Sequence, residues 1–136
     1  MNSCSRRCSD EIIRTSLIRA RTLEHLTPIL PSNASASQNF LLGMFSMIDV
    51  FVSRPMAEVL EELPLDSNLK HALLSKSPSG CGPLALLRAV ERGNREAAES
   101  VCLKLDINPH LFFQTYQQAV TWSDYILKKK TNLGNP

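Results

Sequence analysis

The sequence has neither an excess of one charge nor a long hydrophobic run. Its 136 residues include 15 Lys or Arg and 13 Asp or Glu, which gives a net charge of only +2. Nucleic-acid-binding faces concentrate basic residues, so this balance argues against a nucleic-acid partner. No apolar run approaches the roughly 20 residues that span a bilayer. No apolar core follows the N-terminal arginines, as a secretory signal requires. We therefore expect a cytoplasmic protein without membrane contact.

Motifs for common cofactors are also missing. The five glycines form neither G-x-G-x-x-G nor G-x-x-x-x-G-K-[ST], so no phosphate-binding loop is predicted. The three histidines, His25, His71 and His110, make no H-x-x-x-H or H-E-x-x-H pair. We expect no bound cofactor and no metal, and each histidine is interpreted as a half-exposed helix residue.

Cysteine is scarce, with four residues in the chain. Cys4 and Cys8 have a spacing that can share one helix face, but a zinc site needs further ligands at suitable spacing, and none follow. The turn-like stretch Ser77–Pro83 offers Cys81 or Ser79 as a nucleophile, yet a nucleophile needs a base within hydrogen-bond reach. A ragged N-terminus and a Gly/Pro turn are the favoured interpretations, with zinc binding and a nucleophile as the alternatives.

Strand-like alternation is absent, whereas helical periodicity runs through most of the chain. The pattern predicts an all-α protein, a compact multi-helix bundle of roughly seven helices. Ser9 is a plausible N-cap for the first helix. We expect a flexible N-terminus at 1–9, one helical domain at 10–130 and a flexible tail at 131–136.

Several helix boundaries follow from cap residues. Gly93 is expected at a helix C-terminus, Asn94 at the next N-cap, and Asn108 with Pro109 at the start of the last helix. That helix carries an apolar stripe at three- and four-residue spacing, formed by Phe112, Tyr116, Ala119, Trp122 and Ile126. We expect the stripe to face the core and Trp122 to be largely buried.

Three arginines cluster near the start of the domain. Arg14 and Arg21 lie seven residues apart, hence on one helix face, with Arg19 nearby. They offer contacts to an anion or a nucleotide, and a ligand sensor is one functional hypothesis. A solvated basic face is the more ordinary interpretation.

Taken together, several phrases resemble the C-terminal part of an HDOD domain, closest to those attached to EAL domains in bacterial signalling proteins. The likeness covers roughly Asp10 to Leu127. The phrases are LLGMFSMIDVF, PMAEVLEELPL, GPLALL, ERGN and the WSD of the last helix. The resemblance implies an HD-superfamily-like helical fold and a role in cyclic-dinucleotide-linked signalling. A complete HDOD domain is longer at its N-terminus, so we expect the chain to lack that part.

The resemblance also bears on catalysis, because HDOD domains are related to the HD phosphohydrolases. In those enzymes a phrase similar to G-L-L-H-D-I-G supplies a His and an Asp as metal ligands, and an earlier helix supplies another His. The corresponding positions here are Ser46, Met47 and Thr15. A thioether and two hydroxyls cannot hold a hard divalent ion that activates water. The resemblance therefore implies that this protein is not an enzyme. A residual phosphohydrolase activity is the disfavoured alternative.

The stretch FLLGMFSMIDVF, Phe40 to Phe51, is interpreted as one buried helix laid out on the frame of a former active-site helix. Gly43 is expected to allow close helix packing, and Ser46 to bond back to its own helix backbone. On a continuous helix Asp49 points about 200° away from Met47, so it does not replace the lost ligand.

The favoured function is therefore a non-catalytic signalling output module that binds a protein. The partner is either an unidentified protein or a second copy of the chain. Apolar residues of the first two helices, among them Ile13, Leu17 and Leu41, are the predicted interface. A homodimer would then form through residues Asp10 to Val52.

Overall fold

The computed structural model describes residues 2–30, 34–74 and 83–134. Within these ranges the chain forms eight α-helices and one short 3-10 turn, with no β-strand. The all-α prediction is confirmed. Ser79 and Cys81 lie outside the described residues, as do the side chains of Cys4 and Cys8, so their alternatives stay predictions.

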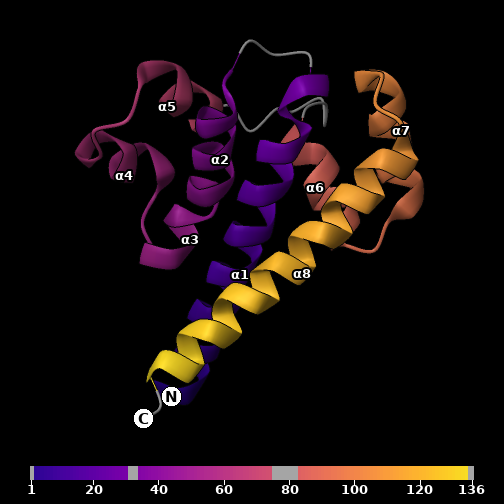
Figure 1. The fold of residues 1–136 in the computed structure, drawn as a ribbon. Helices are drawn as coiled ribbons and strands as arrows, with labels where there is room; N and C mark the ends of the chain where they lie inside the picture. The colour runs from indigo at the N-terminus through magenta and orange to yellow at the C-terminus, as the bar shows by residue number, and fades with distance from the viewer. Residues whose placement is uncertain (1, 31–33, 75–82, 135–136) are drawn as a thin grey trace.

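Two long helices cross at the middle of the molecule, and the shorter ones lie on either side of them (Figure 1). Helices α2 to α5 occupy one side of α1, whereas α6 and α7 occupy the other. The N-terminal part of α1 and the C-terminal part of α8 extend toward the same end of the molecule. The elements are α1 Asn2–Leu26, the 3-10 turn Thr27–Ile29, α2 Ala36–Phe45, α3 Ile48–Val52, α4 Met56–Glu62, α5 Ser67–Leu74, α6 Pro83–Glu91, α7 Arg95–Leu105 and α8 Pro109–Gly134.

Local cap chemistry accounts for several of these boundaries. Ser35 begins α2 with a complete capping box, in which its hydroxyl accepts from Gln38 N and the Gln38 side chain accepts from Ser35 N. Gly93 has a φ of +73° after α6, and the Asn94 side chain caps α7 by accepting from Ala97 N. These two predictions are confirmed. By contrast, Ser9 lies inside α1, which begins at Asn2.

The stretch Phe40 to Phe51 is not one helix, and this prediction is wrong. Helix α2 ends at Phe45, and Met47 has a φ of −121° and a ψ of 16° before α3 begins. The Ser46 hydroxyl donates to the Gly43 carbonyl over 2.7 Å, a bond that competes with regular helix continuation. The back-bonding of Ser46 was predicted correctly, but not the break that accompanies it. The extra break raises the number of described helices above the predicted seven.

The break turns part of the apolar stretch outward. Val50, Phe51 and Val52 of α3 are 54%, 44% and 40% exposed.

No single described helix is long and apolar enough to cross a membrane. Ala36–Val52 and Met56–Glu62 pass that test only as a pair, and they are bent by 112°.

The interior is divided into two apolar clusters. The larger one joins α1, α6, α7 and α8 around fully buried residues such as Leu23, Leu86 and Phe112. The smaller one joins α4 and α5 through Met56, Leu60, Leu69 and Leu73. Leu42 of α2 packs against both clusters and is a bridge between them.

The seam between α1 and α8 differs from the predicted apolar stripe. Beyond Phe112, the buried residues of α8 are small: Thr115, Ala119 and Ser123. Trp122 is partly buried, with the Arg21 guanidinium 4.9 Å from its ring centroid. The small side chains let α8 lie close against α1, and a largely buried Trp122 stays a prediction.

Gly43 of α2 lies directly against the backbone of α1. A Cβ added to it lies 2.5 Å from the Ala20 Cα atom and 2.6 Å from the Arg19 carbonyl carbon. Both are backbone atoms, which cannot move aside as a flexible side chain can. The prediction that Gly43 serves close packing is confirmed.

We expect Gly43→Ala to destabilise the fold by about 2–3 kcal/mol, because it forces α1 and α2 apart. The exposed Ser37→Ala on the same helix is the matched control and should change stability by less than about 0.5 kcal/mol. Urea unfolding followed by circular dichroism measures both. Equal midpoints for the two variants would contradict the close contact.

Candidate functional site

A buried arginine of α1 lies where α1, the end of α2 and the end of α6 meet. Arg19 is 6% exposed. Its Nε and Nη2 atoms donate to the two carboxylate oxygens of Glu91 over 2.8 and 2.7 Å. Such bidentate pairing suits the planar guanidinium, and a buried charge without a partner would be costly.

Ser46 completes this arrangement. Arg19 Nη1 donates a hydrogen bond to the Ser46 hydroxyl over 3.0 Å, and the hydroxyl donates its own hydrogen bond to the Gly43 carbonyl. All three nitrogens of the guanidinium therefore have partners. The network joins three segments of the chain and holds Ser46 in a structural role.

Tyr116 of α8 interacts electrostatically with Glu91 and Arg19 of this network. Burial raises the pKa of Tyr116, and the Glu91 carboxylate raises it further, whereas Arg14 and Arg19 act in the opposite direction. The net effect keeps the phenol neutral at physiological pH. Tyr116 therefore contributes a neutral group to the surroundings of the network.

An apolar groove lies between α1 and the α2–α3 segment. Its volume is about 170 Å³, and Ser16 is its only polar lining residue. The groove is lined by Ile12, Ile13, Ser16, Met44, Phe45, Met47, Ile48 and Phe51. We call it the α1–α3 groove.

The three positions at which the family resemblance expects metal ligands do not form a donor set. Ser46 is bound to Arg19, and Met47 lines the α1–α3 groove. Thr15 is half-buried on α1, where Ser16 and not Thr15 faces the groove. Among the described residues, no group of three His, Cys, Asp or Glu side chains is placed to hold a metal ion.

The arginines of the predicted anion site have separate partners. Arg14 pairs with Asp124 over 3.0 Å, and Arg21 pairs with Glu24 over 3.1 Å. Because Arg19 is bound to Glu91, each of the three is neutralised by a carboxylate. An anion would have to displace these carboxylates, so the geometry does not favour the sensor hypothesis.

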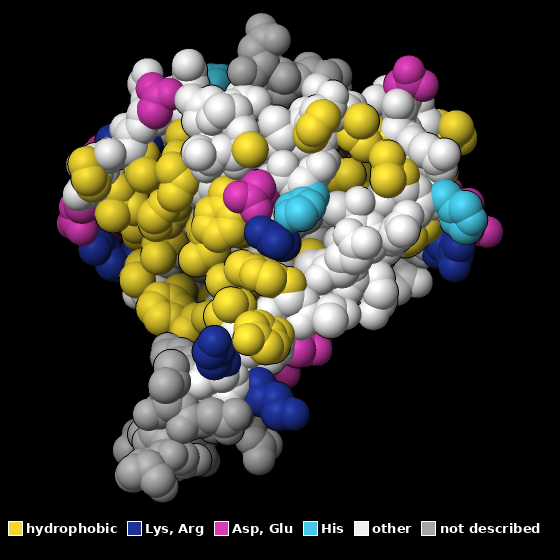
Figure 2. All heavy atoms as spheres, viewed as in Figure 1, with side chains coloured by type: hydrophobic (Ala, Val, Ile, Leu, Met, Phe, Trp, Pro, Cys, Tyr) yellow, Lys and Arg dark blue, Asp and Glu magenta, His cyan; other side chains and the backbone are white. Residues whose placement is uncertain are grey.

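Of the three predicted interface residues, one lines the α1–α3 groove. Ile13 is in the groove wall, Leu17 is half-buried, and Leu41 is 38% exposed. Figure 2 shows hydrophobic side chains spread over the side of the molecule formed by α2 to α5. Val50 and Phe51, which are 54% and 44% exposed here, belong to the stretch that the sequence predicted as a buried helix.

Sequence reasoning missed the role of Glu91. Its side chain is 21% exposed, and 72 positions separate it from Arg19. The residue belongs to the ERGN phrase that carries part of the family resemblance. This motif was the one available sequence signal for Glu91, but it indicates only the end of a helix and does not show that Glu91 pairs with Arg19.

Two curated bacterial proteins are similar to the chain. The Uncharacterized protein YuxH of Bacillus subtilis (strain 168) is 31% identical over 120 residues, which are 88% of this chain and 29% of that protein. The Cyclic di-GMP phosphodiesterase CdgJ of Vibrio cholerae serotype O1 is 29% identical over 120 residues, 85% of this chain and 27% of that protein. The chain thus spans less than a third of the length of either relative. No protein-family model matches it, and no solved structure does.

We expect Arg19→Met to destabilise the protein by about 2–3 kcal/mol, since it leaves Glu91 without its cation. This is less than for a fully buried pair because Glu91 retains some solvent. Combining it with Glu91→Leu should cost less than the sum of the single changes, with a coupling of about 1–3 kcal/mol.

Arg14→Met is the matched control for this cycle. The side chain of Arg14 is 45% exposed, and that of its partner Asp124 is 57% exposed. The substitution should therefore lower the free energy of unfolding by less than about 1 kcal/mol. Denaturant unfolding of the wild type, the two single variants and the double variant provides the double-mutant cycle. Strict additivity of Arg19→Met and Glu91→Leu would show that the two side chains do not interact.

Proposed function

We propose that the chain is a non-catalytic signalling module of HDOD type, which acts by contact in bacterial cyclic-dinucleotide-linked signalling. Similarity to part of a protein named as a cyclic di-GMP phosphodiesterase supports the pathway. The family resemblance of the sequence supports the type of module. The activity of the whole relative is not carried over, because the chain spans 27% of it. The buried free thiol of Cys102 fits the reducing cytoplasm.

The observation that carries the proposal is the engagement of Ser46 by Arg19. In an HD-type metal site this position supplies a carboxylate or imidazole donor, as the resemblance implies. Here it accepts a hydrogen bond from a buried cation, which would repel a divalent metal ion at the same place. The arrangement therefore supports a structural role for the former catalytic position and disfavours the residual phosphohydrolase.

We expect no phosphodiesterase turnover of cyclic di-GMP by the purified chain, and no stoichiometric metal after growth with added manganese, iron or zinc. Elemental analysis and chromatographic product detection measure these. Ser46→Ala should leave both results unchanged. Stoichiometric metal that is lost in Asp49→Ala or His25→Ala would overturn the non-catalytic assignment.

The contact surface that we propose is the α1–α3 groove together with the exposed ridge of α3. An exposed apolar ridge beside an apolar groove is self-complementary, because a two-fold axis between them places the ridge of each copy over the groove of the other. Val50 and Phe51 supply the ridge, and Ile13 with Met47 supplies part of the groove. We therefore propose a second copy of the chain as the occupant.

Sedimentation at micromolar concentration should give a dimer, and Phe51→Glu should convert it to a species of one-chain mass because a charge enters the apolar contact. Leu103→Glu is the matched control. Leu103 is 77% exposed on α7, on the other side of α1 from α3, so this variant should remain dimeric (Figure 1). A wild-type protein that sediments as a single chain would contradict the self-association.

A further inference from the structure

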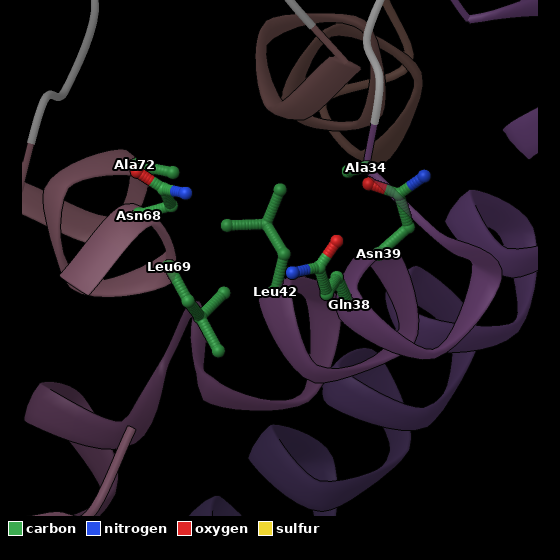
Figure 3. Close-up of a pocket in the computed structure, with 7 residues that line it drawn as sticks. All are labelled: Ala34, Gln38, Asn39, Leu42, Asn68, Leu69 and Ala72. Carbon is green, nitrogen blue, oxygen red and sulfur yellow. The ribbon is translucent and has the colours of Figure 1, made fainter. Parts of the chain in front are cut away.

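A second hollow of the molecule lies between α2 and α5, away from the Arg19 network and the α1–α3 groove. Its volume is about 340 Å³. It is lined by Ala34, Gln38, Asn39, Leu42, Asn68, Leu69 and Ala72 (Figure 3). None of these lining residues carries a charge, and three of the seven carry side-chain amides. The size suits a small organic molecule, and the apolar residues supply its walls.

Asn39 is the most buried of the three amides. It is only 5% exposed, and its nitrogen donates to the Thr27 hydroxyl over 2.9 Å. Thr27 in turn donates its own hydroxyl proton to the Leu23 carbonyl over 2.9 Å. Because Thr27 already uses its hydroxyl proton in this bond, it can only accept a hydrogen bond from Asn39. The amide nitrogen of Asn39 must therefore point toward Thr27.

This chain of bonds leaves the Asn39 carbonyl oxygen without a partner in the described structure. Figure 3 shows that oxygen on the side of the amide that faces the hollow. An amide oxygen that is open to the hollow can accept a hydrogen bond, and a ligand N–H inside the hollow would donate it. The site therefore offers a fixed acceptor before any ligand arrives.

Donors lie on the same hollow. Gln38 is held by two bonds: its oxygen accepts from Ser35 N over 2.9 Å, and its nitrogen lies 3.4 Å from an Asp66 carboxylate oxygen. An amide nitrogen has two hydrogens, so one remains for a ligand. Asn68 is exposed at the edge of the hollow on α5 and adds a second amide.

We propose that this hollow binds a neutral, flat heterocycle whose lactam group offers an N–H to Asn39 and a carbonyl oxygen to Gln38 or Asn68. Leu42 and Leu69 would lie against its apolar body. Uracil-type and hypoxanthine-type bases have this pattern. The described lining residues are uncharged, so they give no reason for a phosphate to add affinity. This binding site does not depend on the proposed signalling function, and either can fail without the other.

Isothermal titration calorimetry with uridine and inosine tests the proposal, and their methylated forms are matched controls. In 3-methyluridine and 1-methylinosine the lactam N–H is replaced by a methyl group on an otherwise equal ring. Loss of one hydrogen bond to this acceptor should weaken binding on the order of tenfold. Comparison of the two pairs shows whether a pyrimidine or a purine fits. Uridine monophosphate should bind no more tightly than uridine.

Two variants place the ligand in this hollow. Asn39→Ala should weaken binding of the better nucleoside about tenfold, and circular dichroism verifies its fold. Should Asn39→Ala fail to fold, Asn68→Ala at an exposed position provides the readout, with a smaller loss of affinity. Equal affinity of the methylated and parent nucleosides, no binding at millimolar concentration, or a folded Asn39→Ala with wild-type affinity would each overturn the assignment.

Discussion

The contact of Gly43 with the backbone of Ala20 is the constraint on which the rest of the arrangement depends. It allows α2 to approach α1 closely enough for Ser46, three residues further on, to reach the Arg19 guanidinium. That bond places a polar group at the end of α2, where the backbone then departs from helix geometry and begins α3. The close approach at Gly43 therefore helps to place the start of α3 beside α1.

The polar network at Arg19 joins three segments of the helical scaffold through one buried charge. A guanidinium with three partners occupies the space between α1, α2 and α6, and none of its nitrogens is left unpaired. A metal ion joins segments by attracting anionic or lone-pair donors. Here the joining charge belongs to the chain itself, and it links α1, the end of α2 and the end of α6.

Local signals in the sequence predicted local features well. Gly93 and Asn94 mark helix ends through their own backbone and side-chain preferences, and the Ser46 hydroxyl needs only a carbonyl three residues away. Features set by distant segments were missed. Periodicity placed Ala119 and Trp122 on the inner face of α8, but it could not show that Ser123 beside them would be fully buried. The pairing of Arg19 with Glu91 depends on how α6 folds back, which one sequence does not reveal.

The division of the interior into two clusters implies unequal cooperativity across the fold. The smaller cluster has four buried residues at its centre, and its helices α4 and α5 are seven and eight residues long. Short helices with little buried surface open at a lower free energy than the global unfolding of the chain. Although Leu42 links the two clusters, we expect the amide protons of α4 and α5 to exchange with solvent before those of α1 and α8.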